Sequence, residues 1–136
     1  MKDISNLEIW MKCIDCIFLD REDIRAAIEV IKTATENIKE GISVFIFPEG
    51  TRFHDDIPRE FKGGSFKIAT RTNCPIIPVS INRCDDILER HFPKITPADI
   101  TLKYGKPIYT DKLSSEEKKN LAFDVQKIIT RMYQNS

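Results

Sequence analysis

Apolar residues recur at intervals of three and four in three stretches of the chain, and this period predicts amphipathic helices. The first stretch covers about residues 4–14, the second about residues 21–40, and the third follows Ser114. Gly41 marks the end of the second helix, because glycine adopts a left-handed conformation at no steric cost. Ser114 and Glu117 have the spacing of a capping box, which predicts the start of the last helix.

Runs of β-branched and aromatic residues predict strands between these helices. The runs are residues 17–19, 42–46, 76–81 and 100–104. Pro78 lies inside the third run and cannot donate to a ladder, so this strand is expected at a sheet edge or an irregularity. The order strand, helix, strand in the first half predicts a βαβ unit with parallel pairing. We therefore predict an α/β fold, a single domain over residues 1–136 with a mostly parallel sheet flanked by helices.

The strand predicted at residues 42–46 runs into the hexapeptide Phe47–Arg52, F-P-E-G-T-R. A proline and a glycine end the strand abruptly, so polar residues lie at its carboxyl end, where ligands bind in open α/β sheets. The Arg52 guanidinium matches two phosphate oxygens at once. Gly50 lets the backbone approach an anion closely, and Thr51 adds a hydroxyl. The hexapeptide therefore predicts an anion site.

This hexapeptide resembles the F-P-E-G-T-R motif of the glycerolipid acyltransferases, which include the 1-acyl-glycerol-3-phosphate (lysophosphatidate) acyltransferases. Cys16–Arg21 resembles the upstream G-x-I-F-I-D-R block of that family, and Ile77–Ile81 resembles its downstream V-P-V-x-I block. The resemblance extends from about Leu7 to Tyr109. It implies a glycerol-3-phosphate acyltransferase-like fold and acyl transfer to lysophosphatidate in phospholipid biosynthesis. Acyl-CoA or acyl-carrier protein would be the co-substrate, with no cofactor and no metal.

The resemblance implies that the hexapeptide holds the glycerol-3-phosphate part of the acyl acceptor. The residues assigned to phosphate binding are Arg52, Gly50, Thr51 and Arg21. Arg21 ends the neighbouring predicted strand, so parallel pairing would place it on the same rim as the hexapeptide. Glu49 would repel a phosphate, and we expect it to orient Arg52 or to accept bonds from loop N–H groups. Pro48 and Pro78 are assigned to the acceptor or acyl pocket.

Each basic residue also has a purely structural interpretation, as a surface charge paired with an acidic neighbour. These neighbours are Asp55 and Asp56 for Arg52, and Glu22 and Asp23 for Arg21. Lys62 and Lys67 add positive charge that could reach a phosphate or a lipid headgroup. A solvated face is the alternative for both lysines.

Acyl transfer needs a general base close to the acceptor hydroxyl, and the family supplies it from an H-x-x-x-x-D motif. Neither of the two histidines fits this motif, because the fifth residue after His54 is Arg59 and the fifth after His91 is Thr96. We expect the catalytic pair, and any membrane-anchoring helices, on a segment that precedes this sequence. His54 is a candidate for a substitute base.

Composition limits the partners that we expect. The 21 Lys and Arg residues balance the 21 Asp and Glu residues, so no global field would attract nucleic acid. No apolar run approaches the ~18 residues of a spanning helix, and no signal peptide opens the chain. We expect a cytoplasmic protein, peripheral at the inner face of a membrane, that binds lysophosphatidate and the acyl donor. Trp10 is interpreted as a core residue, with a membrane interface as the alternative.

Two functions remain open. In the first, the chain is the phosphate-binding part of a truncated acyltransferase with little activity of its own. In the second, it is a non-catalytic lysophospholipid-binding module or a partner subunit. A nucleotide-binding domain is disfavoured, because the chain has no G-x-x-x-x-G-K-[ST] and no G-x-G-x-x-G. Apolar residues around Ile4, Leu7 and Trp10 are expected to be exposed and to favour self-association.

The four cysteines give no clear site. Cys13 and Cys16 form a C-x-x-C, whereas Cys74 and Cys84 stand apart. A zinc site or a redox pair is possible for this spacing. Because Cys16 falls inside a predicted buried strand, we expect four reduced thiols instead.

Overall fold

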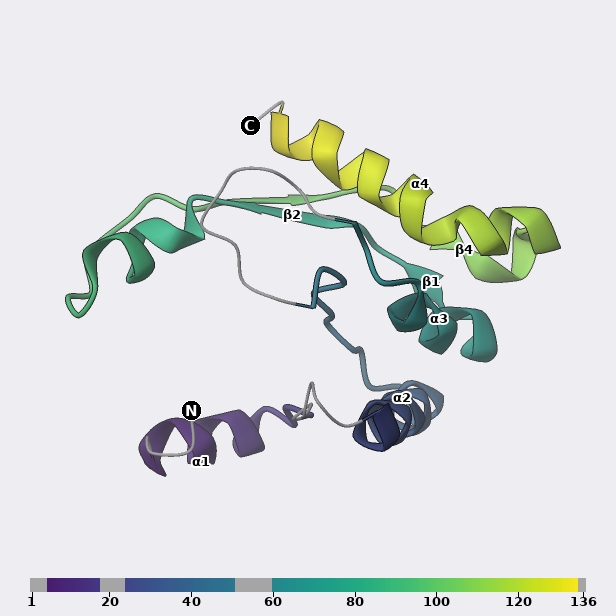
Figure 1. Cartoon of the computed structure of the whole chain (residues 1–136), viewed down its shortest axis with the longest axis horizontal. Helices are drawn as coiled ribbons and strands as arrows, with labels where there is room; N and C mark the ends of the chain where they lie inside the picture. Colours follow the sequence, from purple (N-terminus) through teal and green to yellow (C-terminus); the bar gives the residue numbers. More distant parts are fainter. Residues whose placement is uncertain (1–4, 18–23, 51–59, 135–136) are drawn as a thin grey trace. The chain divides into compact units, whose positions relative to one another are not determined.

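A computed structural model describes residues 5–17, 24–50 and 60–134 (Figure 1). Contacts divide the chain into two compact units, residues 1–44 and residues 45–136. Each unit is described by itself below. The prediction of one domain over residues 1–136 stays a prediction.

The first unit contains two of the predicted helices, α1 (Ser5–Cys13) and α2 (Ile24–Lys39). Gly41 ends α2 with φ +86°, and its N–H donates to the Ile38 carbonyl at 3.0 Å. The Ile42 N–H donates to the Asn37 carbonyl at 2.9 Å. These two bonds form a Schellman motif, which satisfies carbonyls that the helix end leaves without partners. The predicted stop at Gly41 is confirmed.

The end of α1 has the same arrangement with a different residue. Asp15 takes the left-handed position with φ +53°, and its N–H donates to the Lys12 carbonyl at 3.1 Å. The Cys16 N–H donates to the Met11 carbonyl at 2.9 Å. Cys16 therefore belongs to a helix cap and not to the start of a strand, and the remainder of the strand predicted at residues 17–19 lies outside the described residues.

The described apolar side chains in α1 and directly after it are mostly exposed, with Met11 half-buried. Trp10 is 71% exposed, and Ile9 and Ile14 are exposed as well. The interpretation of Trp10 as a core residue is wrong, because no described element covers this part of the helix. Exposure around Trp10 agrees with the expectation from sequence, whereas the side chains of Ile4 and Leu7 lie outside the described part.

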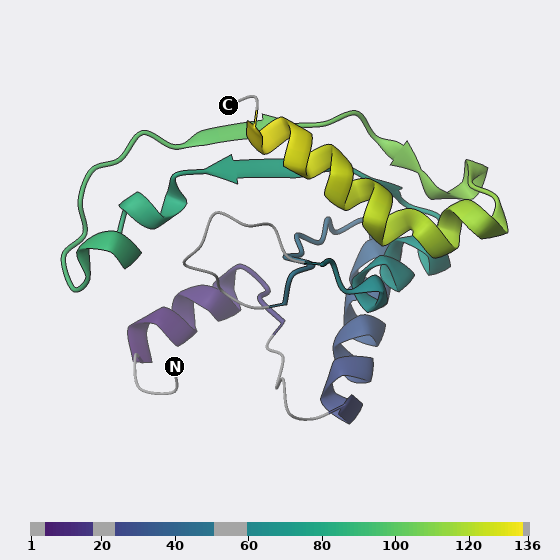
Figure 2. The ribbon, with the colours of Figure 1, turned by 45° about the horizontal axis from the view of Figure 1, so that its top comes forward.

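The second unit is built around the helix α4 (Ser115–Gln134), which runs along the strands in Figures 1 and 2. Leu121 and Val125 of α4 are buried together with Phe61. The partly buried residues around them are Phe66, Ile76, Ile108, Leu113, Ala122 and Ile129. At the start of α4, the Ser114 N–H donates to Glu117 Oε2 at 2.7 Å, and the Glu117 N–H donates to Ser114 Oγ at 3.2 Å. The predicted capping box is confirmed.

The strands of this unit form two short antiparallel pairs. β1 (Pro75–Ile76) pairs with β4 (Ile108–Tyr109), and β2 (Val79–Asn82) pairs with β3 (Thr101–Tyr104). The predicted strand at residues 76–81 is interrupted at Pro78, which has no N–H to donate. The Pro78 carbonyl instead accepts the Gly105 N–H at 2.8 Å. Within the described residues the α/β class holds, but the expected parallel pairing is absent.

Residues 42–46, predicted as a buried strand, pair with no strand in the described part of the chain. Phe45 and Phe47 are exposed, and their rings meet edge to face at 5.1 Å between centroids. A strand requires the N–H and C=O groups of a neighbour. The described residues offer none to this segment, so its β-branched and aromatic composition is not sufficient to make it a strand.

The remaining elements are short. They are η1 (Gly63–Phe66), α3 (Lys67–Thr72), η2 (Cys84–Asp86), η3 (Glu89–His91) and η4 (Thr110–Lys112). Ile68 and Ala69 are the buried residues of α3. Thr110 is fully buried, and its hydroxyl contacts the carbonyls of Ala69 and Cys74 at 3.2 and 3.0 Å. No described helix has both the length and the apolar character needed to cross a membrane.

Candidate anion site

The first four residues of the hexapeptide form a tight turn. The Gly50 N–H donates to the Phe47 carbonyl at 3.2 Å, and Gly50 has φ +68°. Pro48 occupies the second position of this turn, which suits the fixed φ of proline. Pro48, Glu49 and Gly50 are all half-buried. The turn places the backbone of Gly50 directly before Thr51 and Arg52.

Lys62 lies against this turn although it is twelve residues further along the chain. Its N–H donates to the Pro48 carbonyl at 2.9 Å. A Cβ at position 50 would lie 3.1 Å from both Cε and Nζ of Lys62. Glycine is thus required at position 50 for two reasons, the positive φ and the space that the lysine side chain fills. The arrangement brings an ammonium group to the residue that precedes Thr51 and Arg52.

The core of the second unit holds Lys62 in place. Phe61, the preceding residue, is buried, and its N–H donates to Gln126 Oε1 on α4 at 3.3 Å. The Ser65 N–H donates to the Lys62 carbonyl at 3.1 Å, so the lysine backbone is fixed on both sides. An open hollow of about 240 Å³ lies between the segment around Phe61 and α4. Among the described residues, the Lys62 ammonium has no acidic partner.

Several assigned residues fall outside the described part of the chain. They are Arg21, Thr51, Arg52 and His54. Pro78 is fully buried, with Gly105 and Met132 next to it. His91 lies exposed in η3. The roles assigned to these residues stay predictions.

The described residues give no support to a metal site or a disulfide. No cluster of three or more His, Cys, Asp or Glu side chains in that part of the chain could hold a metal ion. All four cysteines are free thiols, with Cys13 and Cys84 exposed. The C-x-x-C spacing at Cys13 and Cys16 therefore coincides with the end of α1 and brings no further ligand with it.

Sequence reasoning identified the turn and weighed Lys62, but it did not place them together. Gly50 was the residue that indicated this contact, because a glycine is often needed where another group approaches the backbone closely. The sequence does not show which residue packs against Gly50, because the residues between Gly50 and Lys62 do not determine where Lys62 lies in the fold. The contact follows from the burial of Phe61 beside it.

A lysine packed on a proline-glycine turn suits the binding of an anion. Comparisons with known proteins identify the family of this chain. A family model described as "Acyltransferase" matches residues 1–82. The chain belongs to this acyltransferase family, and the resemblance found in its sequence motifs is confirmed.

Individual relatives agree with this assignment. The chain is 32% identical over 130 residues to a probable 1-acyl-sn-glycerol-3-phosphate acyltransferase of Mycoplasma genitalium, covering 90% of this chain and 48% of the relative. It is 38% identical over 100 residues to the 1-acyl-sn-glycerol-3-phosphate acyltransferase of Cocos nucifera, covering 73% of this chain and 32% of the relative. The chain thus spans about half the length, or less, of these curated relatives.

A solved structure supports the fold. The crystal structure of the 1-acyl-sn-glycerophosphate (LPA) acyltransferase PlsC from Thermotoga maritima matches with a TM-score of 0.80 and 29% identity. The match covers 98% of this chain and 52% of that one. The predicted acyltransferase-like α/β fold is therefore confirmed at the level of the fold, with the strand pairings described above.

Proposed function

We propose that this chain binds the phosphate of lysophosphatidate for an acyl transfer in phospholipid biosynthesis. The acyl group would pass from acyl-CoA or acyl-carrier protein to the free hydroxyl of the acceptor. The names of the relatives support this acceptor. The observation that carries the proposal is the packing of the Lys62 ammonium against Gly50, next to Thr51 and Arg52 in the sequence.

The chemistry of these residues suits a phosphate monoester. A guanidinium donates two parallel hydrogen bonds to phosphate oxygens, and an ammonium adds a compact point charge. We assign the first role to Arg52 and the second to Lys62, with Thr51 offering a backbone N–H group and Gly50 allowing the backbone to approach the anion closely. Because a carboxylate would repel the ligand, Glu49 orients Arg52 or accepts bonds from loop N–H groups and does not contact the phosphate.

The other assigned residues complete the proposed site. Arg21 supplies a second guanidinium to the same phosphate. Pro48, half-buried on the turn, contributes to the acceptor pocket. Pro78 is buried beneath Gly105, so in this proposal it shapes the acyl pocket from behind and does not touch the ligand.

This proposal does not assign a proton-abstracting base to this chain. Neither His54 nor His91 is followed by aspartate at the spacing of the family motif. The contribution that we propose is recognition of the acceptor phosphate, with His54 as the residue to test for any base activity. The protein would act on the inner face of a membrane from the cytoplasmic side.

Titration with a soluble short-chain lysophosphatidate tests the phosphate role. Arg52→Ala and Lys62→Ala should each weaken binding about tenfold or more, because hydrogen bonds to charged groups contribute about 1.5–3 kcal/mol. Lys127→Ala is the matched control, since its ammonium lies 4.5 Å from the Phe123 ring centroid on α4 and should not affect the titration. Equal affinities in all four proteins would refute the proposal.

The absence of an H-x-x-x-x-D motif favours a second candidate, a non-catalytic lysophospholipid-binding module or partner subunit. A radiolabelled acyl-transfer assay separates the two functions. The binding module predicts phosphate-dependent lipid binding without turnover. Turnover by this chain that is lost in His54→Ala would exclude the module and assign the base to His54.

Self-association is the last part of this proposal. Trp10 and Ile14 leave an apolar surface on α1, and such surfaces often form interfaces. Size-exclusion chromatography at several concentrations should therefore show oligomers that Trp10→Ser weakens. A monomer at every concentration would contradict this expectation.

A further inference from the structure

The segment between β2 and β3 forms an arm, residues 83–96, whose tip carries two exposed apolar side chains. Phe92 is 76% exposed and Ile95 is 77% exposed. Figures 1 and 2 both show this segment projecting beyond the end of β2 that lies away from β1. At the base of the arm, the Asn82 side chain donates to the Tyr133 carbonyl at 3.3 Å and ties β2 to the end of α4.

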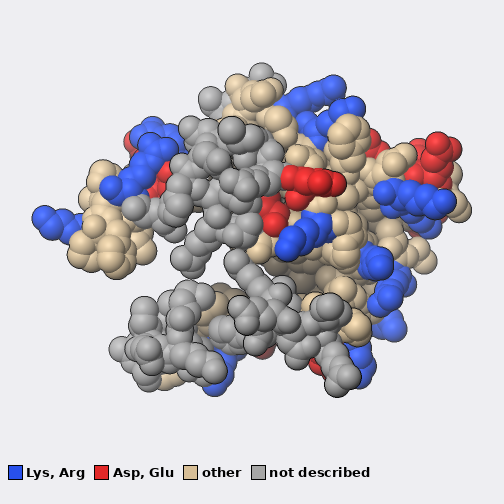
Figure 3. All heavy atoms as spheres, in the orientation of Figure 1, with Lys and Arg blue, Asp and Glu red and all other residues tan. Residues whose placement is uncertain are grey.

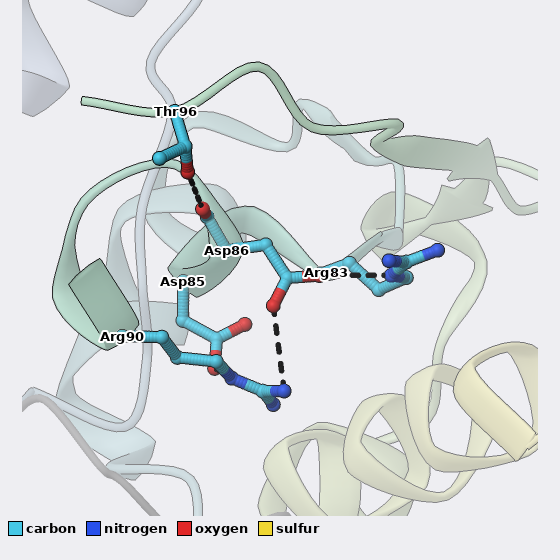
Figure 4. A network of polar contacts seen from close by, with 5 residues as sticks. All are labelled: Arg83, Asp85, Asp86, Arg90 and Thr96. Atoms are coloured by element: carbon cyan, nitrogen blue, oxygen red, sulfur yellow. Dashed lines mark hydrogen bonds and ion pairs between the residues drawn. The ribbon is translucent and has the colours of Figure 1, made fainter.

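A network of polar contacts fixes the shape of the arm (Figure 4). The Asp86 carboxylate accepts Arg83 Nε at 2.9 Å and lies 3.3 Å from Arg90 Nη1. Arg90 Nε also contacts Asp85 Oδ2 at 2.5 Å. The Thr96 hydroxyl donates to the Asp86 carbonyl at 2.8 Å, which joins the two ends of the arm. The tip is therefore held in place and need not lose much conformational entropy when it binds.

The same network pairs the two aspartates of the arm with arginines. Arg83 and Arg90 neutralise the two aspartates, so the arm has no unpaired Asp. Outside the network, Glu89 precedes the tip and Lys94 lies between its two apolar residues. Figure 3 shows basic and acidic side chains beside uncharged ones at this part of the surface. A lysine between exposed apolar side chains complements an anionic lipid surface, where each basic residue contributes about 1 kcal/mol.

The size of the apolar tip argues against a folded protein as its partner. Phe92 and Ile95 together offer at most about 300–400 Å², given the 150–250 Å² of a buried aromatic side chain. A stable interface between two proteins buries about 800 Å² on each partner. A bilayer imposes no such minimum, because it receives each apolar side chain separately.

We propose that the arm inserts Phe92 and Ile95 into the interfacial region of an anionic lipid bilayer, with Lys94 against the headgroup phosphates. Phenylalanine and aliphatic side chains form the apolar face of protein segments that bind at this depth. This contact does not depend on the acyl transfer proposed above. Variants of the arm should therefore leave the titration with soluble lysophosphatidate unchanged.

Partition onto vesicles of phosphatidylcholine with a minor fraction of phosphatidylglycerol tests the proposal. Phe92→Ser with Ile95→Ser should weaken binding at least about tenfold, because two apolar side chains lose their burial. Lys94→Glu should weaken it about fivefold or more on these vesicles, and less on neutral ones. Phe123→Ser is the control, since this ring is also exposed and also lies beside a lysine. Far-ultraviolet circular dichroism verifies that each variant is folded.

A reporter at the tip makes the test specific. Trp10 is the single tryptophan, so Trp10→Phe with Phe92→Trp moves the fluorophore to the arm. Its emission should shift to the blue on vesicles and be quenched by brominated lipid. An unquenched tip, or Phe92→Ser/Ile95→Ser binding vesicles like the parent, would overturn the proposal. It is also overturned if that double variant instead dissociates a dimer in the absence of lipid.

Discussion

Helices α1 and α4 have similar apolar periodicity but very different surroundings. In α4, Leu121 and Val125 are 3% and 2% exposed and pack against Phe61. In α1, Ile9 and Trp10 remain exposed. The contrast teaches that a helical period predicts the helix and its apolar face, whereas the partner of that face depends on residues far away in the sequence.

The largest difference is expected from deleting one apolar side chain in each helix. Leu121→Ala should lower the free energy of unfolding by about 2–5 kcal/mol, because it leaves a cavity in the core. Ile9→Ala should change it by less than about 0.5 kcal/mol, as for other exposed positions. Urea unfolding measures both values. Similar losses for the two variants would show that α1 is covered after all.

Two glycines allow a sharper form of the same comparison between local and distant effects. Gly41 and Gly50 both have positive φ, but a Cβ at Gly41 meets nothing within 4 Å, whereas one at Gly50 meets Lys62. Gly41→Ala should lower the free energy of unfolding by about 1 kcal/mol through the backbone alone. Gly50→Ala should cost about 1–3 kcal/mol, since the lysine must also move. Equal losses in thermal unfolding would mean that the contact with Lys62 contributes nothing.

The start of α4 should show a smaller effect. Ser114→Ala removes a capping hydroxyl and should lower the free energy of unfolding by about 0.5–2 kcal/mol. Ser115→Ala is the control, because this neighbour is not the cap and should change stability by less than about 0.5 kcal/mol. Circular dichroism on heating follows both. If the two substitutions are equivalent, the capping box is not formed in solution.

The smallest effect concerns pH. Hydrogen bonds from the Ser114 side chain and backbone hold the pKa of Glu117 below its ordinary value of 4.5. A lowered pKa in the folded state means that the contribution to stability is complete above pH 4.5 and is lost as the pH falls through the folded value. Glu117→Gln should remove this part of the acid dependence. A carbon-detected NMR titration that places the Glu117 pKa at or above 4.5 would contradict this account.

Sequence reasoning succeeded where the physics is local. The capping box at Ser114, the helix stop at Gly41 and the interruption at Pro78 each depend on a few neighbouring residues, and the structure has all three. The strand predicted at residues 42–46 did not form, because a strand depends on a partner that composition does not specify. β4 was not predicted, because it has only two residues and is defined by its pairing with β1.

The candidate site also has one part that could be predicted from local sequence and one part that could not. The hexapeptide could be found from its residues and from its resemblance to the acyltransferases, because the motif is continuous in sequence. The return of Lys62 to Gly50 could not be found, since it depends on how Phe61 packs under α4. Trp10 was misplaced for the same physical reason, as nothing in its own helix shows whether another element covers it.

The central claim is that Lys62 and Arg52 bind one phosphate together, and a double-mutant cycle tests it most directly. Calorimetric titration of glycerol 3-phosphate into the parent, both single variants and the double variant gives the coupling energy. We predict a coupling of at least about 0.5 kcal/mol, as for residues that share a partner. Changes in binding free energy that add without coupling would contradict the account. Single variants that both bind with the affinity of the parent would contradict it as well.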